Sequence, residues 1–218
     1  MMKRYVWAGI VFLAMAMGTS VGMSASAADT ASAADKTATA PQVELDTSMG
    51  KIKLELFPQA APKTVENFLG YVKSGFYDGT LFHRVIDKFM IQGGGYDEKL
   101  QEKPTKPPIP NEGPENQKAG VKNTIGTIAM ARRPDPNSAS AQFFINVANN
   151  TPLDYTASTP QGYGYTVFGK VIEGMDVVNK IAKVETGMQG GQGNLPKTPV
   201  VIHKAVVVKA GNKGAAAK

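Results

Sequence analysis

The chain has no cysteine, only two histidines and a single tryptophan among its 218 residues. Without cysteine there is no disulfide framework, thiol nucleophile or cysteine-ligated metal, and this absence is compatible with an oxidising compartment without demonstrating one. The two histidines, His83 and His203, lie far apart and have no cysteine partners, which argues against a zinc site. No Gly-x-Ser-x-Gly motif or Walker loop occurs. We therefore expect neither a metal nor a cofactor.

Positive charge is present but is not concentrated anywhere. The formal net charge is +6, yet no run of Lys and Arg is longer than two residues, and 18 acidic residues are interspersed. Binding to nucleic acid or to an anionic surface would favour clustered basic residues. The pattern indicates a solvated, mildly basic surface, and we expect no nucleic-acid partner.

A long apolar run occurs at the N-terminus. A basic start precedes the apolar residues 6–17, and the small residues Ala25-Ser26-Ala27 follow. This order predicts a secretory signal peptide over residues 1–27. An uncleaved membrane anchor is the alternative, because residues 6–27 carry no charge and could span a bilayer. The Gly- and Ser-rich second half of this span favours cleavage, so we expect no stable membrane association of the mature chain.

The rest of the chain has the length of one domain with short appendages. Residues 28–40 contain no large apolar side chain and are predicted to be a flexible leader. The folded domain is expected over residues 41–210, and residues 211–218 are expected to be a disordered tail. Within the domain, residues 97–123 contain five prolines and no periodicity, which is typical of a functional or mobile surface loop.

Hydrophobic periodicity predicts a β-rich domain with two helices. Alternation on both sides of the turn at residues 47–50 indicates a hairpin. A helix is predicted from Pro62 to Gly75 and a second from about Met175 to Lys183. Further strands are predicted at Leu81–Ile86, Phe89–Gln92, Thr127–Ala131, Gln142–Val147, Thr166–Val171 and Val200–Val208. Propensity alone favours a closed antiparallel barrel and a sandwich about equally.

The most informative segment runs from Phe82 to Gly94, with the sequence FHRVIDKFMIQGG. A second segment, Ala141 to Ile145, again sets one amide side chain among apolar residues. Both resemble the signature blocks of the cyclophilins, which are peptidyl-prolyl cis/trans isomerases, and the resemblance continues through residues 126–131 and 167–171. It covers residues 43–209 and is greatest to the secreted, periplasmic bacterial members. The implied fold is mainly β: a closed eight-stranded antiparallel β-barrel with an α-helix over each open end.

Prolyl isomerisation needs none of the groups that this chain lacks. Amide resonance holds the X-Pro bond planar, with a rotation barrier of about 18–20 kcal/mol. Rotation returns a lone pair to the prolyl nitrogen, and a cation aimed there would stabilise the twisted state more than the planar one. A planar, permanently charged arginine in an apolar pocket suits this task. The resemblance assigns it to Arg84.

The resemblance also implies the residues around Arg84. His83 could be catalytic by position, but a histidine packed beside the site is the favoured interpretation. The resemblance implies that a hydrophobic socket holds the proline ring, formed by Phe89, Met90, Phe144 and Leu153. It also implies that the amides of Gln92 and Gln142 hold the substrate backbone and orient Arg84. The strand edge at Ala131 and Arg132 would contact the substrate residues that precede the proline.

Two positions depart from the family pattern. Pro152 stands where many cyclophilins carry a tryptophan, and Tyr165 replaces the usual histidine near the Val-Phe-Gly block. Tyrosine can still donate a hydrogen bond and line the pocket. Proline lacks the aromatic face and the indole N–H that the inhibitor cyclosporin uses in sensitive members. We therefore expect cyclosporin to bind weakly.

These observations predict a secreted isomerase, located in the periplasm, that acts on proline-containing unfolded or exported polypeptides. We expect a monomer without metal or cofactor. The alternative is a non-catalytic peptide-binding or chaperone module on the same fold. The complete set around Arg84 argues against this alternative, because a binding module has no need of a donor that stabilises a transition state.

Overall fold

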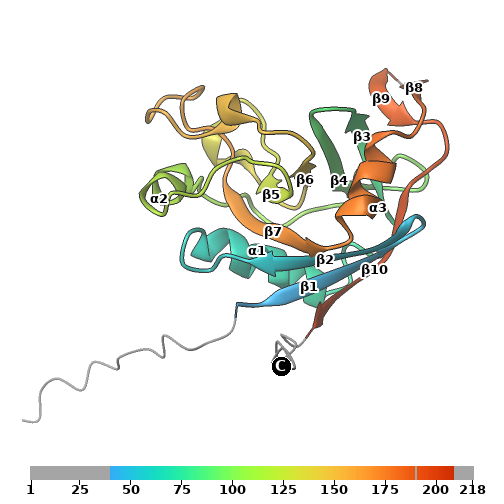
Figure 1. Ribbon diagram of the computed structural model, residues 1–218, viewed down its shortest axis with the longest axis horizontal. Helices are drawn as coiled ribbons and strands as arrows, with labels where there is room; N and C mark the ends of the chain where they lie inside the picture. Colours follow the sequence, from blue (N-terminus) through green and yellow to red (C-terminus); the bar gives the residue numbers. More distant parts are fainter. Residues whose placement is uncertain (1–39, 190, 209–218) are drawn as a thin grey trace, which may run out of the picture. The chain divides into compact units, whose positions relative to one another are not determined.

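The computed structural model describes residues 40–189 and 191–208, and these form one compact unit. Eight strands close into an antiparallel barrel in the order β1-β10-β3-β4-β6-β5-β7-β2 (Figure 1). The predicted mainly-β, eight-stranded barrel is therefore confirmed. Its strands are β1 (Gln42–Thr47), β2 (Gly50–Leu56), β3 (Thr80–Ile86), β4 (Met90–Asp97), β5 (Thr127–Met130), β6 (Phe143–Asn146), β7 (Val167–Glu173) and β10 (Val201–Val208).

The β1–β2 hairpin shows how alternation builds the barrel wall. Alternate residues of both strands are buried, and Val43 faces Leu54 across the hairpin. At the turn the Thr47 hydroxyl donates to the Gly50 carbonyl oxygen at 2.5 Å. Gly50 has a φ of +127°, a backbone conformation that residues other than glycine rarely adopt. Because β1 also pairs with β10, the first and last barrel strands lie side by side (Figure 1).

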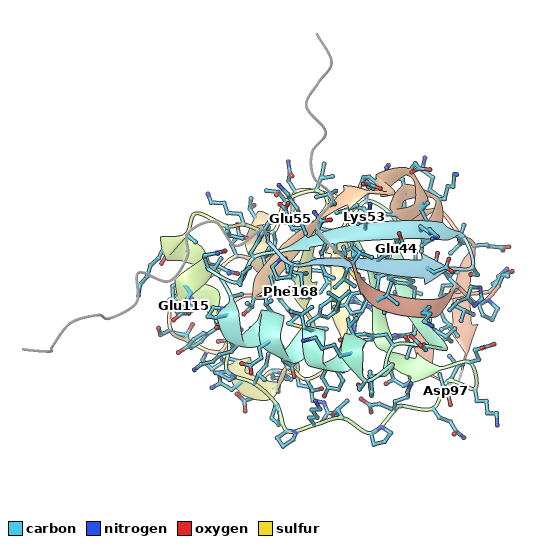
Figure 2. All side chains as sticks on the ribbon, turned by 90° about the horizontal axis from the view of Figure 1, so that it is seen from below. Glu44, Lys53, Glu55, Asp97, Glu115 and Phe168 are labelled. Carbon is cyan, nitrogen blue, oxygen red and sulfur yellow. The ribbon has the colours of Figure 1, made fainter. Side chains whose placement is uncertain are left out.

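The two faces of this wall differ in chemistry. Glu44 pairs with Lys51 at 2.7 Å and Lys53 with Glu173 at 2.8 Å on the exposed side. Figure 2 shows Glu44 and Lys53 on the strands, with Phe168 between these strands and the first helix. Phe168 is fully buried. Exposed ion pairs contribute about 0–1 kcal/mol each, so the buried apolar side chains provide most of the stability of this wall.

Two helices pack on the barrel and share its core. These are α1 (Pro62–Lys73) and α3 (Met175–Ala182), close to the predicted ranges. Their buried side chains include Val65, Phe68, Val72, Val178 and Ile181. The Phe68 ring centroid lies 5.0 Å from that of Phe168 and 5.8 Å from that of Phe143. The apolar stripe of α1 thus closes the barrel interior.

A third helix, α2 (Gly113–Lys118), corrects the expectation of two helices. It lies within residues 97–123, where the sequence predicts an irregular loop. The buried Asn116 side chain donates to the carbonyl oxygens of Ala60 at 3.1 Å and Val167 at 2.9 Å. It also accepts from the Val167 N–H at 2.6 Å. Long-range hydrogen bonds anchor this short helix, and these leave no periodic signal in the sequence.

A small hairpin, β8 (Thr186–Gln189) with β9 (Gln192–Pro196), forms a separate two-stranded sheet. The segment shows no apolar alternation that would predict strands, and neither strand was expected from the sequence. The hairpin lies beside β3 (Figure 1). Its backbone pairing, and not side-chain patterning, defines these two strands.

Strand β4 is longer than predicted because three glycines continue it. The expected strand ends at Gln92, whereas β4 runs on to Asp97. A Cβ at Gly93 would lie 2.8 Å from the Leu81 carbonyl oxygen, which is too close, so only glycine fits at this position. Glycine usually weakens a strand, but here it permits the close approach of neighbouring backbone.

Several predicted segments lie outside the described residues. These are the signal peptide over residues 1–27, nearly all of the leader over 28–40, and the tail over 211–218. Across residues 40–189 and 191–208, none of the helices has the length and apolar character needed to span a bilayer.

Candidate active site

Arg84 lies on β3 directly opposite Gln92 on β4. Its Nη1 donates to Gln92 Oε1 at 3.3 Å. The side chain is half-buried, whereas the next residue, Val85, points into the core. Within the described part of the chain, this is the only hydrogen bond of the guanidinium. Most of its five N–H donors therefore remain available to a bound molecule.

Gln142 continues the polar contacts beyond Gln92. The Gln92 Nε2 donates to Gln142 Oε1 at 3.0 Å. Gln142 lies immediately before β6, and its neighbour Ala141 accepts a hydrogen bond from the buried Tyr77 hydroxyl at 2.9 Å. Burial raises the pKa of Tyr77 well above 10.0, so this hydroxyl is a stable donor at neutral pH. The backbone that carries Gln142 is thus held firmly.

A cavity of about 190 Å³ opens beside Arg84, and we call it the apolar cavity because most of its lining residues are apolar or aromatic. Nine of the eleven predicted site residues line it. They are Arg84, Phe89, Met90, Gln92, Ala131, Arg132, Phe144, Leu153 and Tyr165. The cavity therefore brings together residues that are up to 81 positions apart, from Arg84 to Tyr165.

The apolar wall of this cavity belongs to a small cluster separate from the main core. Met90 and Phe144 are almost fully buried in it. The Tyr165 ring lies edge-on to Phe144 with centroids 5.6 Å apart. The Leu153 carbonyl oxygen accepts from the Tyr165 N–H at 2.9 Å, which fixes the two sides of the mouth. Pro152 is exposed next to Leu153 and does not line the cavity.

The Arg132 side chain is largely occupied by hydrogen bonds to loop carbonyl oxygens. Its guanidinium donates to the carbonyl oxygens of Gly164 at 2.8 Å and Pro160 at 2.9 Å. It also donates to those of Arg133 and Pro134. The guanidinium carbon lies 4.9 Å from the Tyr165 ring centroid. Arg132 therefore ties two loops together at the cavity rim, and its side chain has few donors left for a ligand.

His83 and Gln142 are the two predicted residues that do not line the apolar cavity. Both line a neighbouring cavity of about 420 Å³, together with Tyr96 and Asn194. His83 is only 5% exposed, and its ring Nδ1 has no hydrogen-bond partner among the described residues. Burial, assisted by the Arg84 charge, lowers the pKa of His83 from 6.5 to about 4. His83 is therefore neutral at physiological pH.

A third cavity, of about 410 Å³, adjoins the apolar one and shares Gln92, Ala131 and Arg132 with it. Sequence reasoning missed most of its wall. The missed residues are Glu102, Thr105, Lys106, Pro108, Arg133, Ser138 and Ser140. Several of them lie in the predicted loop over residues 97–123, and Ser138 and Ser140 lie in a second loop at residues 135–140. Nothing in the local sequence indicates that the two loops face each other across a groove.

The arrangement is suited to an extended peptide with one compact apolar ring. The small cavity, with its apolar wall, adjoins the two larger ones, and the Arg84 guanidinium lines both the small cavity and the one beside His83. In residues 40–189 and 191–208, no cluster of His, Asp and Glu has the spacing of a metal site. The chemistry that this site can supply is charge and hydrogen-bond donation to a bound chain.

Comparisons with known sequences agree with this geometry. The family model described as "Cyclophilin type peptidyl-prolyl cis-trans isomerase/CLD" matches residues 42–207. A peptidyl-prolyl cis-trans isomerase of Streptomyces antibioticus is 55% identical, and the match covers 76% of this chain and 98% of that relative. Peptidyl-prolyl cis-trans isomerase B of Escherichia coli is 49% identical over the same shares of both chains.

Solved structures give the same result. A cyclophilin-type peptidyl-prolyl cis-trans isomerase of Cryptosporidium parvum, determined in the presence of the dipeptide Ala-Pro, is 28% identical to this chain with a TM-score of 0.61. The match covers 78% of this chain and 99% of that structure. The likeness therefore extends over the whole barrel.

Proposed function

The chain belongs to the cyclophilin-type peptidyl-prolyl cis-trans isomerases, and on this premise we propose that Arg84 drives the reaction by stabilising the twisted X-Pro amide. The observation that carries the proposal is the half-buried guanidinium at the mouth of the apolar cavity, held by a single hydrogen bond to Gln92. Its remaining donors can reach a prolyl nitrogen whose ring occupies that cavity.

Electrostatics of this kind acts mainly on the transition state. In the planar amide the nitrogen lone pair is delocalised and attracts a cation weakly. At the twisted geometry the lone pair is localised, and a nearby guanidinium stabilises it. An acceleration of five decades needs about 7 kcal/mol of this differential stabilisation, at about 1.36 kcal/mol per decade. A proline ring that fills the cavity would displace water from it, and this would strengthen the interaction.

The remaining side chains bind and orient. Phe89, Met90, Phe144 and Leu153 form the socket for the proline ring. Gln92 holds the guanidinium in place, and the neutral His83 supports β3 beside it. Since burial lowers the pKa of His83 to about 4, it is not an imidazolium at neutral pH and is not suited to act as a general acid. The reaction then needs no acid or base group.

The substrates of this enzyme are proline-containing polypeptides. The Cryptosporidium relative was solved in the presence of Ala-Pro, and this supports proline-containing peptides as ligands. The N-terminal sequence supports a role on exported or unfolded chains in the periplasm. Weak binding of cyclosporin stays a prediction, supported by the proline at position 152.

The Arg84 mechanism can be tested in a coupled proline-isomerisation assay with an X-Pro peptide. Arg84→Ala should lower kcat/KM by at least 100-fold, because the transition-state donor is lost. Arg84→Lys keeps the charge but loses the planar fork, and we expect intermediate activity. Thermal unfolding should be nearly unchanged in both variants. Wild-type turnover by a folded Arg84→Ala enzyme would show that the rate enhancement arises elsewhere.

A further inference from the structure

Glu102 lies at the far end of the polar contacts that begin at Arg84. Arg84 donates to Gln92 at 3.3 Å, Gln92 donates to Gln142 at 3.0 Å, and Gln142 Nε2 donates to Glu102 Oε1 at 3.4 Å. Four side chains thus form a continuous relay from a cation to an anion. We propose that Glu102 is a positioning residue that fixes Arg84 through this relay.

The chemistry of the two ends gives the relay a single direction. A guanidinium can only donate hydrogen bonds, and an ionised carboxylate can only accept them. Each amide between them has one donor end and one acceptor end. With Gln142 donating to Glu102, its oxygen faces Gln92, and the oxygen of Gln92 then faces Arg84. The opposite amide orientation would turn an NH₂ group toward the guanidinium. Glu102 therefore favours the orientation that holds Arg84.

The backbone around Glu102 is anchored to β4, so the position of the carboxylate is defined. Glu102 forms an isolated antiparallel bridge with Tyr96. The next residue, Lys103, donates its N–H to the Gly95 carbonyl oxygen at 2.9 Å. The Lys103 ammonium also donates to the carbonyl oxygen of Phe76. Residue 102 is thus fixed by backbone pairing, even though its side chain is 47% exposed.

Gly95 provides the space in which Gln142 lies. A Cβ at this position would lie 2.4 Å from Gln142 Cγ and 2.6 Å from its Nε2. Real side chains do not approach so closely, so the amide rests flat against the backbone of β4. The glycine and the bridge at Tyr96 belong to the same strand. The central amide and the terminal carboxylate are therefore positioned by one rigid element.

Arg133 forms a long ion pair with Glu102. Its Nη2 lies 4.0 Å from Glu102 Oε1, and its side chain is 80% exposed. An exposed pair at this distance contributes little. The carboxylate thus has a second, weaker neighbour on the solvent side. Glu102 could affect catalysis through its negative charge in the groove or through its hydrogen bond to Gln142, and the experiment must distinguish these two effects.

The test compares variants of the full mature chain in the isomerisation assay. Glu102→Ala removes the terminal acceptor and should lower kcat about 3- to 10-fold, with KM changed less than about twofold. Glu102→Gln removes the charge but keeps an oxygen that can accept, and because Arg84 still sets the direction from the other end of the relay, this variant should retain most of the activity. Glu98→Ala is the matched control, because Glu98 is an exposed acidic residue of the same loop. It should keep wild-type kcat.

Two further measurements isolate the relay. In a Gln142→Leu background, Glu102→Ala should cause no additional loss, because the link to Gln92 is already broken. In nuclear magnetic resonance spectra, the side-chain NH₂ signals of Gln92 should shift in Glu102→Ala and stay in place in Glu98→Ala. If Glu102 instead acted through the charge of the groove, the kcat of Glu102→Gln would fall as far as that of Glu102→Ala. That result would overturn the proposal.

The relay rests on the proposed role of Arg84, yet the two can fail separately. If Arg84→Ala is inactive while Glu102→Ala is indistinguishable from the wild type, the Arg84 mechanism stands and the relay is wrong. If Arg84→Ala is fully active, the mechanism itself fails. An unchanged Gln92 signal in Glu102→Ala would also refute the relay, whatever the activity.

Discussion

At the scale of single residues, most positions of the site can be predicted from the sequence, but Glu102 cannot. Arg84 and Gln92 lie in one short block, so a β-hairpin suffices to bring them together. Gln142 stands in a second block of recognisable character. Glu102 lies in an aperiodic, proline-rich segment, and long-range contacts such as the bridge to Tyr96 and the Lys103–Gly95 hydrogen bond place it at the site. Long-range backbone pairing of this kind has no local signature.

His83 gives a prediction for stability against pH. Burial lowers its pKa to about 4 in the folded chain, whereas an unfolded histidine titrates near 6.5. Between these values the unfolded state binds a proton that the folded state excludes. Folding stability therefore falls as pH decreases from about 6.5 to 4. At about 1.36 kcal/mol per unit, the loss approaches 3 kcal/mol.

Urea unfolding at pH 7 and pH 4.5 can measure this contribution. Between pH 7 and pH 4.5, the free energy of unfolding of His83→Gln should decrease by about 2–3 kcal/mol less than that of the wild type. His203, which is exposed on β10, provides the control: His203→Gln should lose as much as the wild type. Parallel losses in the wild type and His83→Gln would show that His83 takes up protons equally in both states.

At the scale of elements, the start of α1 depends on a residue from a distant segment. The N-cap residue, Ala61, has no side-chain hydrogen bond to offer. The buried Glu112 carboxylate takes over this function. It accepts from the Lys63 N–H at 3.0 Å, from the Thr64 N–H at 2.9 Å and from the Thr64 hydroxyl at 2.7 Å. An anion at a helix N-terminus is also favoured by the helix dipole.

Removing this carboxylate should destabilise the domain without altering the chemistry. Glu112→Ala leaves three buried or half-buried donors without an acceptor, and we expect a loss of about 2–4 kcal/mol. Glu115→Ala on α2, whose side chain is exposed (Figure 2), should cost less than about 0.5 kcal/mol. Urea denaturation of both variants measures the difference. A loss below 1 kcal/mol in Glu112→Ala would mean that water replaces the carboxylate as acceptor.

The elements missed by sequence reasoning share a physical cause. Helix α2 is six residues long and is anchored by Asn116, while the β8–β9 hairpin is held by its own backbone pairing. Periodicity reports burial of an apolar face, and neither element has a regular one. Helices α1 and α3 were predicted because each buries an apolar stripe against the barrel.

At the scale of the whole molecule, barrel closure depends on pairings between distant strands. β1 pairs with β10 and β2 with β7, across separations that no local pattern encodes. Propensity therefore left a barrel and a sandwich equally favoured, and only the family blocks distinguished them. Every barrel strand has neighbours on both sides, so the site on β3 and β4 stands on a wall without free edges.

Export supplies the last prediction, because the single tryptophan, Trp7, lies within the predicted signal peptide and outside the described residues. The barrel begins at Gln42, so cleavage after Ala27 would leave every barrel strand intact. Protein recovered after export should therefore be an active isomerase that shows tyrosine but no tryptophan emission, and its N-terminal sequence should begin at Ala28. The uncleaved chain, produced without export, should retain tryptophan emission and serves as the control. Tryptophan fluorescence from the exported protein would support a retained N-terminal anchor.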